Sequence, residues 1–125
     1  MPISIMDKVK AAKALVPDIS PAEAMDLLGH ANAVFVDVRD GAEIAASGKV
    51  PGALAISRGM LEFRADTGLP SHHDALSPGK TIVLYCASGG RAALSGVALQ
   101  ELGYTDVRNL GGFQGWVDAG GAVEK

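Results

Sequence analysis

The chain has 125 residues, of which 48% are hydrophobic, and it carries a formal net charge of −3 with a sequence pI near 5.5. This length suits one domain built around one core. The acidic balance and the lack of a basic stripe exclude a typical nucleic-acid-binding protein, whose affinity comes from clustered lysine and arginine. The single cysteine excludes an intrachain disulfide, a Cys-x-x-Cys pair and a cysteine zinc site, and it favours a reducing compartment.

The N-terminal segment has the pattern of a helix that packs on a folded domain. Residues 6–16 are partly amphipathic, and charged residues such as Asp7 and Lys8 interrupt the apolar core that a signal peptide needs. No run approaches the ~20 apolar residues of a membrane span. We therefore expect a soluble, cytoplasmic protein without a membrane partner, in which residues 1–18 form a helical extension of a domain over residues 19–125.

The remaining elements alternate between helices and strands. Ser20-Pro21-Ala22-Glu23 predicts a helix start, because it supplies an N-cap serine, a proline at the first helical position and a glutamate at the third. The predicted helices cover residues 6–16, 20–29, 42–47 and 91–102, with a helical turn at 60–64. The predicted strands cover residues 33–38, 53–56, 81–85 and 107–110. This alternation predicts an α/β fold with a mainly parallel sheet.

A long polar connection, from Arg64 to Pro78, leads into the strand at 81–85. Connections of this length inside a compact domain are often functional. We expect this connection to border the ligand-binding edge of the sheet and to shape the access of a second substrate that accepts a transferred group. Its two histidines, His72 and His73, are adjacent and cannot easily chelate one metal ion together, so they do not predict a zinc site.

The stretch from Tyr85 to Arg91 carries the strongest chemical signal, because it places Cys86 between a buried strand and the start of a helix. Unpaired amides, the positive end of a helix dipole and the Arg91 cation each stabilise a thiolate, which is the nucleophilic form of cysteine. Gly89 and Gly90 permit the tight loop that such a cradle needs. The sequence therefore predicts a reactive thiol held by the backbone of residues 87–91, in a cradle that also suits an anionic substrate.

Other charged residues follow the predicted strands. Asp37 and Arg39 lie at the carboxyl edge of a buried strand, where a structural ion pair is the favoured interpretation because buried charges need partners. Arg58 follows the next short strand and is a candidate to face the same crevice, with a solvated surface position as its alternative. Arg91 either opens an exposed helix, braces the loop or orients an anionic donor.

Three ordered motifs carry a family resemblance. Cys86-Ala87-Ser88-Gly89-Gly90-Arg91 is similar to the active-site loop of the rhodanese (sulfurtransferase) family. Asp37-Val38-Arg39-Asp40 with Glu43, followed by Gly48-Lys49-Val50-Pro51-Gly52-Ala53, resembles the first signature of that family, and Leu110-Gly111-Gly112-Phe113-Gln114-Gly115-Trp116 resembles the closing one. Together they cover residues 34–118, which is more specific than a lone Cys-x-x-Gly match. Lys49 departs from the histidine that the family often has, and the spacing from Glu43 to Gly48 is one residue longer than the commonest form.

The resemblance implies a rhodanese-like three-layer domain with a mainly parallel central sheet and helices on both faces. It also implies a sulfurtransferase in which Cys86 carries a transferable sulfur as a persulfide. A small anionic donor such as thiosulfate and a thiol, cyanide or protein acceptor are the expected partners, without a metal ion or an organic cofactor. The expected substrate-binding residues are Ala87, Ser88, Gly89, Gly90, Arg91 and Arg58.

Two alternatives stay open at this point. The first is a persulfide carrier or regulatory module, which holds sulfur for a partner protein with negligible turnover of small molecules. The second is a cysteine phosphatase, a chemistry that related folds perform with a Cys-x5-Arg loop. Only four residues separate Cys86 from Arg91, and Tyr85 occupies the place where such phosphatases commonly have histidine, so the phosphatase is the weaker alternative.

Overall fold

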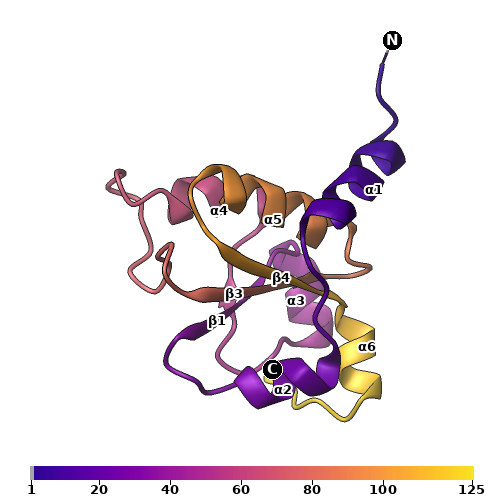
Figure 1. Ribbon diagram of the computed structural model, residues 1–125. Helices are drawn as coiled ribbons and strands as arrows, with labels where there is room; N and C mark the ends of the chain where they lie inside the picture. Colours follow the sequence, from indigo (N-terminus) through magenta and orange to yellow (C-terminus); the bar gives the residue numbers. More distant parts are fainter. Residues whose placement is uncertain (1) are drawn as a thin grey trace.

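The computed structural model describes residues 2–125 (Figure 1). Its helices are α1 (Ile5–Leu15), α2 (Pro21–Leu27), α3 (Gly41–Ser47), α4 (Arg58–Ala65), α5 (Gly90–Glu101) and α6 (Phe113–Asp118). Its strands are β1 (Ala33–Asp37), β2 (Leu54–Ala55), β3 (Thr81–Cys86) and β4 (Asp106–Gly112). The strands form one sheet in the order β2-β1-β3-β4, and each neighbouring pair is parallel. The predicted α/β class is therefore confirmed.

The sheet separates two apolar clusters, because successive side chains of a strand point to opposite faces. Ile82 and Leu84 of β3 pack with residues of α4 and α5 on one face. Val83 and Tyr85 pack with residues of α2 and α6 on the other. All four side chains are fully buried. A central strand covered on both faces reads as a continuous apolar run, as the sequence of β3 does.

The N-terminal helix α1 packs on α5. The side of α1 that faces the domain is buried at Val9 and Ala12, and Val16, directly after the helix, is buried as well. Gly96 of α5 makes this close approach possible, because a Cβ atom there would lie 2.7 Å from a methyl carbon of Val16. Gln100 adds a hydrogen bond from its Nε2 to the carbonyl oxygen of Leu15, at 3.0 Å. The division of the chain into a helical extension over residues 1–18 and a domain over residues 19–125 stays a prediction.

The local signals in the sequence place most elements correctly. Ser20 caps α2 as predicted, since its Oγ accepts from the amide of Glu23 at 3.1 Å and the Glu23 carboxylate accepts from the Ser20 amide. The turn predicted at residues 60–64 is a full helix, α4. The helix α6 was not predicted at all, because glycines precede and interrupt its short sequence.

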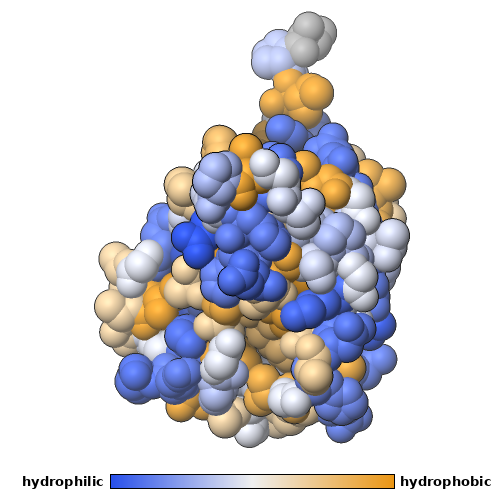
Figure 2. Space-filling view, turned by 90° about the vertical axis from the view of Figure 1, so that its left-hand side faces the viewer, coloured by the Kyte–Doolittle hydropathy of each residue, from blue (hydrophilic) through white to orange (hydrophobic). Residues whose placement is uncertain are grey.

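The connection from Arg64 to Pro78 does not border Cys86, so that prediction was wrong. It leads into Thr81 at the amino end of β3, whereas Cys86 is the last residue of that strand. The connection and the Cys86 loop thus lie at opposite ends of the sheet (Figure 1). His73 lines a groove along β2 and α4 to which the Cys86 loop contributes no residue. Figure 2 faces this amino end of the sheet and shows hydrophilic residues around a hollow with a more apolar floor.

Within residues 2–125, no helix combines the length and the apolar character needed to cross a membrane. No group of three or more histidine, cysteine, aspartate or glutamate side chains in the same range is placed to hold a metal ion.

Candidate active site

The site is built around Cys86, whose side chain is buried at the carboxyl end of β3. The amide of Gly89 donates a hydrogen bond to Cys86 Sγ, with 3.0 Å between nitrogen and sulfur. Gly89 reaches this position because its φ is +94°, a left-handed conformation that glycine adopts without steric cost. The same residue is the N-cap of α5, so the sulfur faces the positive end of that helix. This arrangement stabilises negative charge on sulfur.

The end of β4 holds the loop in place. Asn109 Nδ2 donates to the carbonyl oxygen of Gly89 at 3.1 Å, while Asn109 Oδ1 accepts from the Gly111 amide at 2.8 Å. Gly112 lies so close that a Cβ atom there would sit 2.5 Å from the carbonyl oxygen of Ala87. Sequence reasoning missed Asn109. Its signal was a polar residue inside a predicted strand, two positions before the first of two consecutive glycines.

The other predicted loop residues occupy different positions. Ala87 and Ser88 are exposed at the tip of the loop. Gly90 begins α5 and faces α1. A Cβ atom at this position would lie 3.7 Å from a methyl carbon of Val9. Of the backbone amides in residues 87–91, the one with a hydrogen bond to sulfur is that of Gly89.

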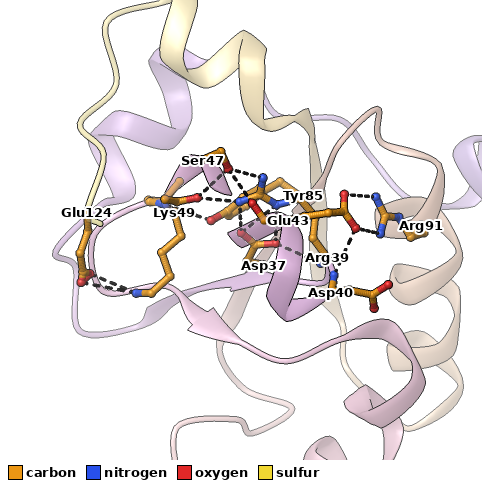
Figure 3. Close-up of polar contacts among 11 residues, drawn as sticks. Asp37, Arg39, Asp40, Glu43, Ser47, Lys49, Tyr85, Arg91 and Glu124 are labelled. Carbon is orange, nitrogen blue, oxygen red and sulfur yellow. Dashed lines mark hydrogen bonds and ion pairs between the residues drawn. The ribbon is translucent and has the colours of Figure 1, made fainter. Parts of the chain in front are cut away.

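Arg91 is paired with a carboxylate from another helix (Figure 3). Its Nη1 and Nη2 donate to Glu43 Oε1 and Oε2 of α3, at 2.7 and 2.9 Å. This two-point contact ties the first turn of α5 to α3. The hydrogen bond to Glu43 is the main cause that raises the pKa of Arg91, with a smaller contribution from the nearby Cys86. Of the roles considered for Arg91, this geometry favours bracing of the loop.

The pair between Glu43 and Arg91 predicts a pH-dependent stability. Its hydrogen bonds lower the pKa of Glu43 from 4.5 to about 2. A carboxyl group with a lowered folded-state pKa stabilises the fold fully above its unfolded pKa, and this contribution disappears as the pH falls through the folded pKa. We expect Glu43→Gln to cost about 0.5–1 kcal/mol above pH 4.5, the upper range for half-exposed pairs, and progressively less toward pH 2. Urea unfolding between pH 2.5 and 7 measures this difference.

Glu101→Gln is the matched control for that measurement. Glu101 lies at the other end of α5 and makes no ion pair within residues 2–125. Because its variant removes no ion pair, it should not show the loss of stability above pH 4.5 that is expected of Glu43→Gln. A constant offset for the Glu43 variant, from neutral pH to pH 2.5, would contradict an ionic contribution from this pair.

A second ion pair orders the neighbouring segment (Figure 3). Asp37 and Arg39 are almost completely buried, and Arg39 Nη2 lies 2.7 Å from Asp37 Oδ2. Arg39 also donates to Ser47 Oγ and to the carbonyl oxygen of Gly48, each at 2.8 Å. Its guanidinium stacks over the ring of Phe113, 4.5 Å from the centroid. The predicted structural ion pair is confirmed, and it links β1 to the end of α3.

Arg58, which was predicted to face the same crevice as Cys86, begins α4, and its role in substrate binding stays a prediction. Its amide donates to the Val38 carbonyl oxygen at 3.1 Å, which places its backbone at the carboxyl edge of the sheet. Its side chain, however, lines a groove formed by α1, α4 and α5, to which no residue of the loop contributes.

The cysteine loop lies within a part of the chain that matches a known protein family. Residues 20–119 match the model of the rhodanese-like domain. The chain belongs to the rhodanese-like family. Its relatives include a sulfurtransferase from Allochromatium vinosum, 34% identical over 70% of this chain and 74% of the relative. Thiosulfate sulfurtransferase GlpE from Actinobacillus succinogenes is 32% identical over 86% of this chain and 89% of the relative.

A third relative of this rhodanese-like chain is longer. Protein HIGH ARSENIC CONTENT 1, mitochondrial, from Arabidopsis thaliana is 34% identical over 86% of this chain, which spans only 64% of that protein's length.

Solved structures confirm the rhodanese-like fold. A protein of unknown function from Rhodopseudomonas palustris, described as a possible tyrosine phosphatase, is 36% identical with a TM-score of 0.90, over 99% of this chain and 96% of its own. The human single-domain sulfurtransferase is 29% identical with a TM-score of 0.70, over 82% of this chain and 96% of its own. The two relatives differ in described activity, so similarity of fold does not by itself define the reaction at Cys86.

Proposed function

We propose that this protein is a sulfurtransferase that moves a sulfane sulfur through a persulfide on Cys86. The Cys86 thiolate attacks the outer sulfur of a donor such as thiosulfate, the S–S bond of the donor breaks, and sulfite leaves with the bonding electrons. An acceptor nucleophile then attacks the outer sulfur of the persulfide, and the Cys86 thiolate leaves. With cyanide as the acceptor, the product is thiocyanate.

The contact between the Gly89 amide and Cys86 Sγ carries this proposal. The Gly89 amide, a hydrogen-bond donor held 3.0 Å from the sulfur, stabilises the thiolate before it attacks. It does so again when the thiolate is regenerated as the leaving group. Gly89 is held in turn by Asn109, so the amide needs no rearrangement during the reaction. The relatives named as sulfurtransferases support the same chemistry.

The partners in this proposal follow from the site. The donor is a small anion, because the cysteine lies at a helix N-terminus and next to the amide of Gly89. The acceptor is a thiol, cyanide or a protein thiol in a reducing compartment such as the cytoplasm. The two half-reactions use the chain's own groups and route no step through a metal ion or an organic cofactor.

Intact-protein mass spectrometry after thiosulfate treatment tests the proposal. We expect a mass gain of one sulfur atom, which cyanide or dithiothreitol removes. Multiple turnover with thiosulfate and cyanide supports an enzyme, whereas a stable persulfide that only a protein acceptor discharges supports a sulfur carrier. A protein that gains no sulfur from any sulfane donor would refute both.

The Rhodopseudomonas relative makes a phosphatase the second function to test. Two observations weigh against it. Four residues separate Cys86 from Arg91, so the loop is one residue shorter than a Cys-x5-Arg ring. The Arg91 guanidinium, which such a ring aims at the phosphoryl group, is held by Glu43 instead. Hydrolysis of p-nitrophenyl phosphate that Cys86→Ser abolishes would reverse this preference.

Arg91 is expected to act through its contact with Glu43. We predict that Arg91→Ala and Glu43→Gln each lower kcat/KM for thiosulfate about tenfold, and that the double variant is no worse than Arg91→Ala alone, because both remove one brace. Steady-state kinetics of the three variants measure this non-additivity. A loss of about 2–4 kcal/mol in Arg91→Ala with an unchanged Glu43→Gln would instead place the guanidinium on the donor.

A further inference from the structure

The N-terminal helix α1 contributes a wall to a cavity beside the Cys86 loop. This cavity has a volume of about 300 Å³, and Ser88 and Gly89 of the loop line it together with Lys13 from the last turn of α1. Asp18 and Asn109 add to its polar lining. Cys86 does not line the cavity, but its sulfur is 3.0 Å from the amide nitrogen of Gly89, which does. α1 lies outside residues 20–119 that match the family model, so this wall is an addition to the common domain.

The position of α1 is held firmly enough to place Lys13. Val9 contacts the start of α5 at Gly90, and Val16 packs against Gly96 one and a half turns further along. Both valines are buried. Figure 1 shows α1 beside α5 at the same end of the sheet as the loop. Lys13 therefore sits between two anchored positions, close to the loop that holds the reactive sulfur.

The charges near the loop leave Lys13 as an available cation. The Arg91 guanidinium is occupied by Glu43, and the Arg39 guanidinium is occupied by Asp37. Arg58 makes no ion pair within residues 2–125, but it lines the groove of α1, α4 and α5 and not this cavity. Lys13 makes no ion pair with any residue of the described range 2–125, although Asp18 lines the same cavity. The three lysines of α1, with one aspartate, give this helix a positive charge in a chain whose net charge is negative.

We propose that Lys13 binds the anionic group of the sulfur compound that reacts at Cys86, and that the cavity it shares with Ser88 and Gly89 is the subsite for that group. Asp18 lines the same cavity, and its negative charge disfavours an anion there. This inference rests on the proposed sulfurtransferase function. The anion belongs either to the donor, as the sulfonate end of thiosulfate, or to a carboxylate-bearing thiol acceptor.

The test compares charge changes at the cavity with the same change elsewhere on α1. The rate of persulfide formation at increasing thiosulfate concentration is followed by quenched intact-mass spectrometry. We expect Lys13→Glu to raise the half-saturating concentration about tenfold and Lys13→Gln about threefold, with Lys13→Arg close to wild type, because the side chain is exposed and acts on the bound anion through its charge. Asp18→Asn should lower it. Half-molar salt should shrink each difference.

Lys10→Glu is the matched control, because Lys10 is exposed on the same helix and lines none of the cavities near the loop. It changes the net charge equally and should shift the half-saturating concentration less than twofold. Lys13 also lies where it can offset the dipole at the end of α1, but loss of that role would lower stability without changing the donor concentration dependence.

A second arm identifies the source of the anion. Preloaded persulfide is discharged with mercaptoacetate, which is anionic, and with mercaptoethanol, which is neutral. A Lys13→Glu effect on thiosulfate loading assigns the subsite to the donor, and an effect on mercaptoacetate alone assigns it to the acceptor. Equal behaviour of Lys13→Glu and Lys10→Glu in both half-reactions would overturn the inference while leaving the sulfurtransferase intact. A wild type that forms no persulfide would refute the proposed function itself.

Discussion

Cys86→Ser is expected to abolish sulfur transfer while the fold stays intact. The hydroxyl is close in size to the thiol and can accept the same amide hydrogen bond from Gly89, so the buried position remains filled. It cannot form a persulfide, because an alkoxide neither attacks sulfane sulfur effectively at neutral pH nor leaves from the adduct. We expect turnover with thiosulfate and cyanide to fall at least about a thousandfold. Initial rates and the mass gain after thiosulfate treatment measure the loss.

Cys86→Ala serves as the control, since it removes the hydroxyl as well. Both variants should unfold in urea with the wild-type cooperativity, and neither should gain sulfur. Wild-type turnover in the Ser variant would remove Cys86 from the mechanism. Loss of cooperative unfolding in both variants would show that the thiol is needed mainly for packing.

The second large effect is expected on stability. Asp37→Asn should lower the free energy of unfolding by about 3–5 kcal/mol, because it leaves the buried Arg39 guanidinium without its counter-charge. Asp37 accepts from Arg39 Nε at 3.0 Å and from Arg39 Nη2 at 2.7 Å, so an amide that donates from one side cannot replace it. Urea unfolding at pH 7 gives the value.

Asp106→Asn is a control of the same sequence pattern. Asp106 and Arg108 form the other Asp-x-Arg pair, with 2.9 Å between Oδ1 and Nε, but their side chains are 41% and 37% exposed. Its loss should cost no more than about 1 kcal/mol, as is typical of exposed ion pairs. Equal costs for the two asparagine variants would mean that burial does not decide the strength of these pairs.

The elements that could be predicted from sequence are those with strong local signals. β3 is a continuous apolar run, and the Ser20-Pro21-Ala22-Glu23 start defines α2 through contacts within one turn. α6 lacked such a signal. It forms because Phe113 and Trp116 are buried against the sheet, which compensates for a weak helical propensity.

The loop that carries Cys86 could also be predicted locally, because Cys86, Gly89 and the first turn of α5 are contiguous along the chain. Its partners could not. Glu43 lies 48 residues before Arg91, and Asn109 lies 20 residues after Gly89, so only packing of α3 and β4 around the loop brings them into contact. Because the sequence does not show that Glu43 is the partner of Arg91, it could not decide among the roles considered for Arg91.

By itself, the sequence determined the α/β alternation and the position of the loop that carries Cys86, since hydrophobic periodicity, turn residues and helix starts all act over a few residues. The tertiary structure decided which charges meet. It placed the connection from Arg64 to Pro78 at the amino end of the sheet and turned Arg58 toward α1 and α5. It also brought Lys13 beside Ser88 and Gly89. These relations depend on strand direction and on helix packing across the chain, which no local pattern encodes.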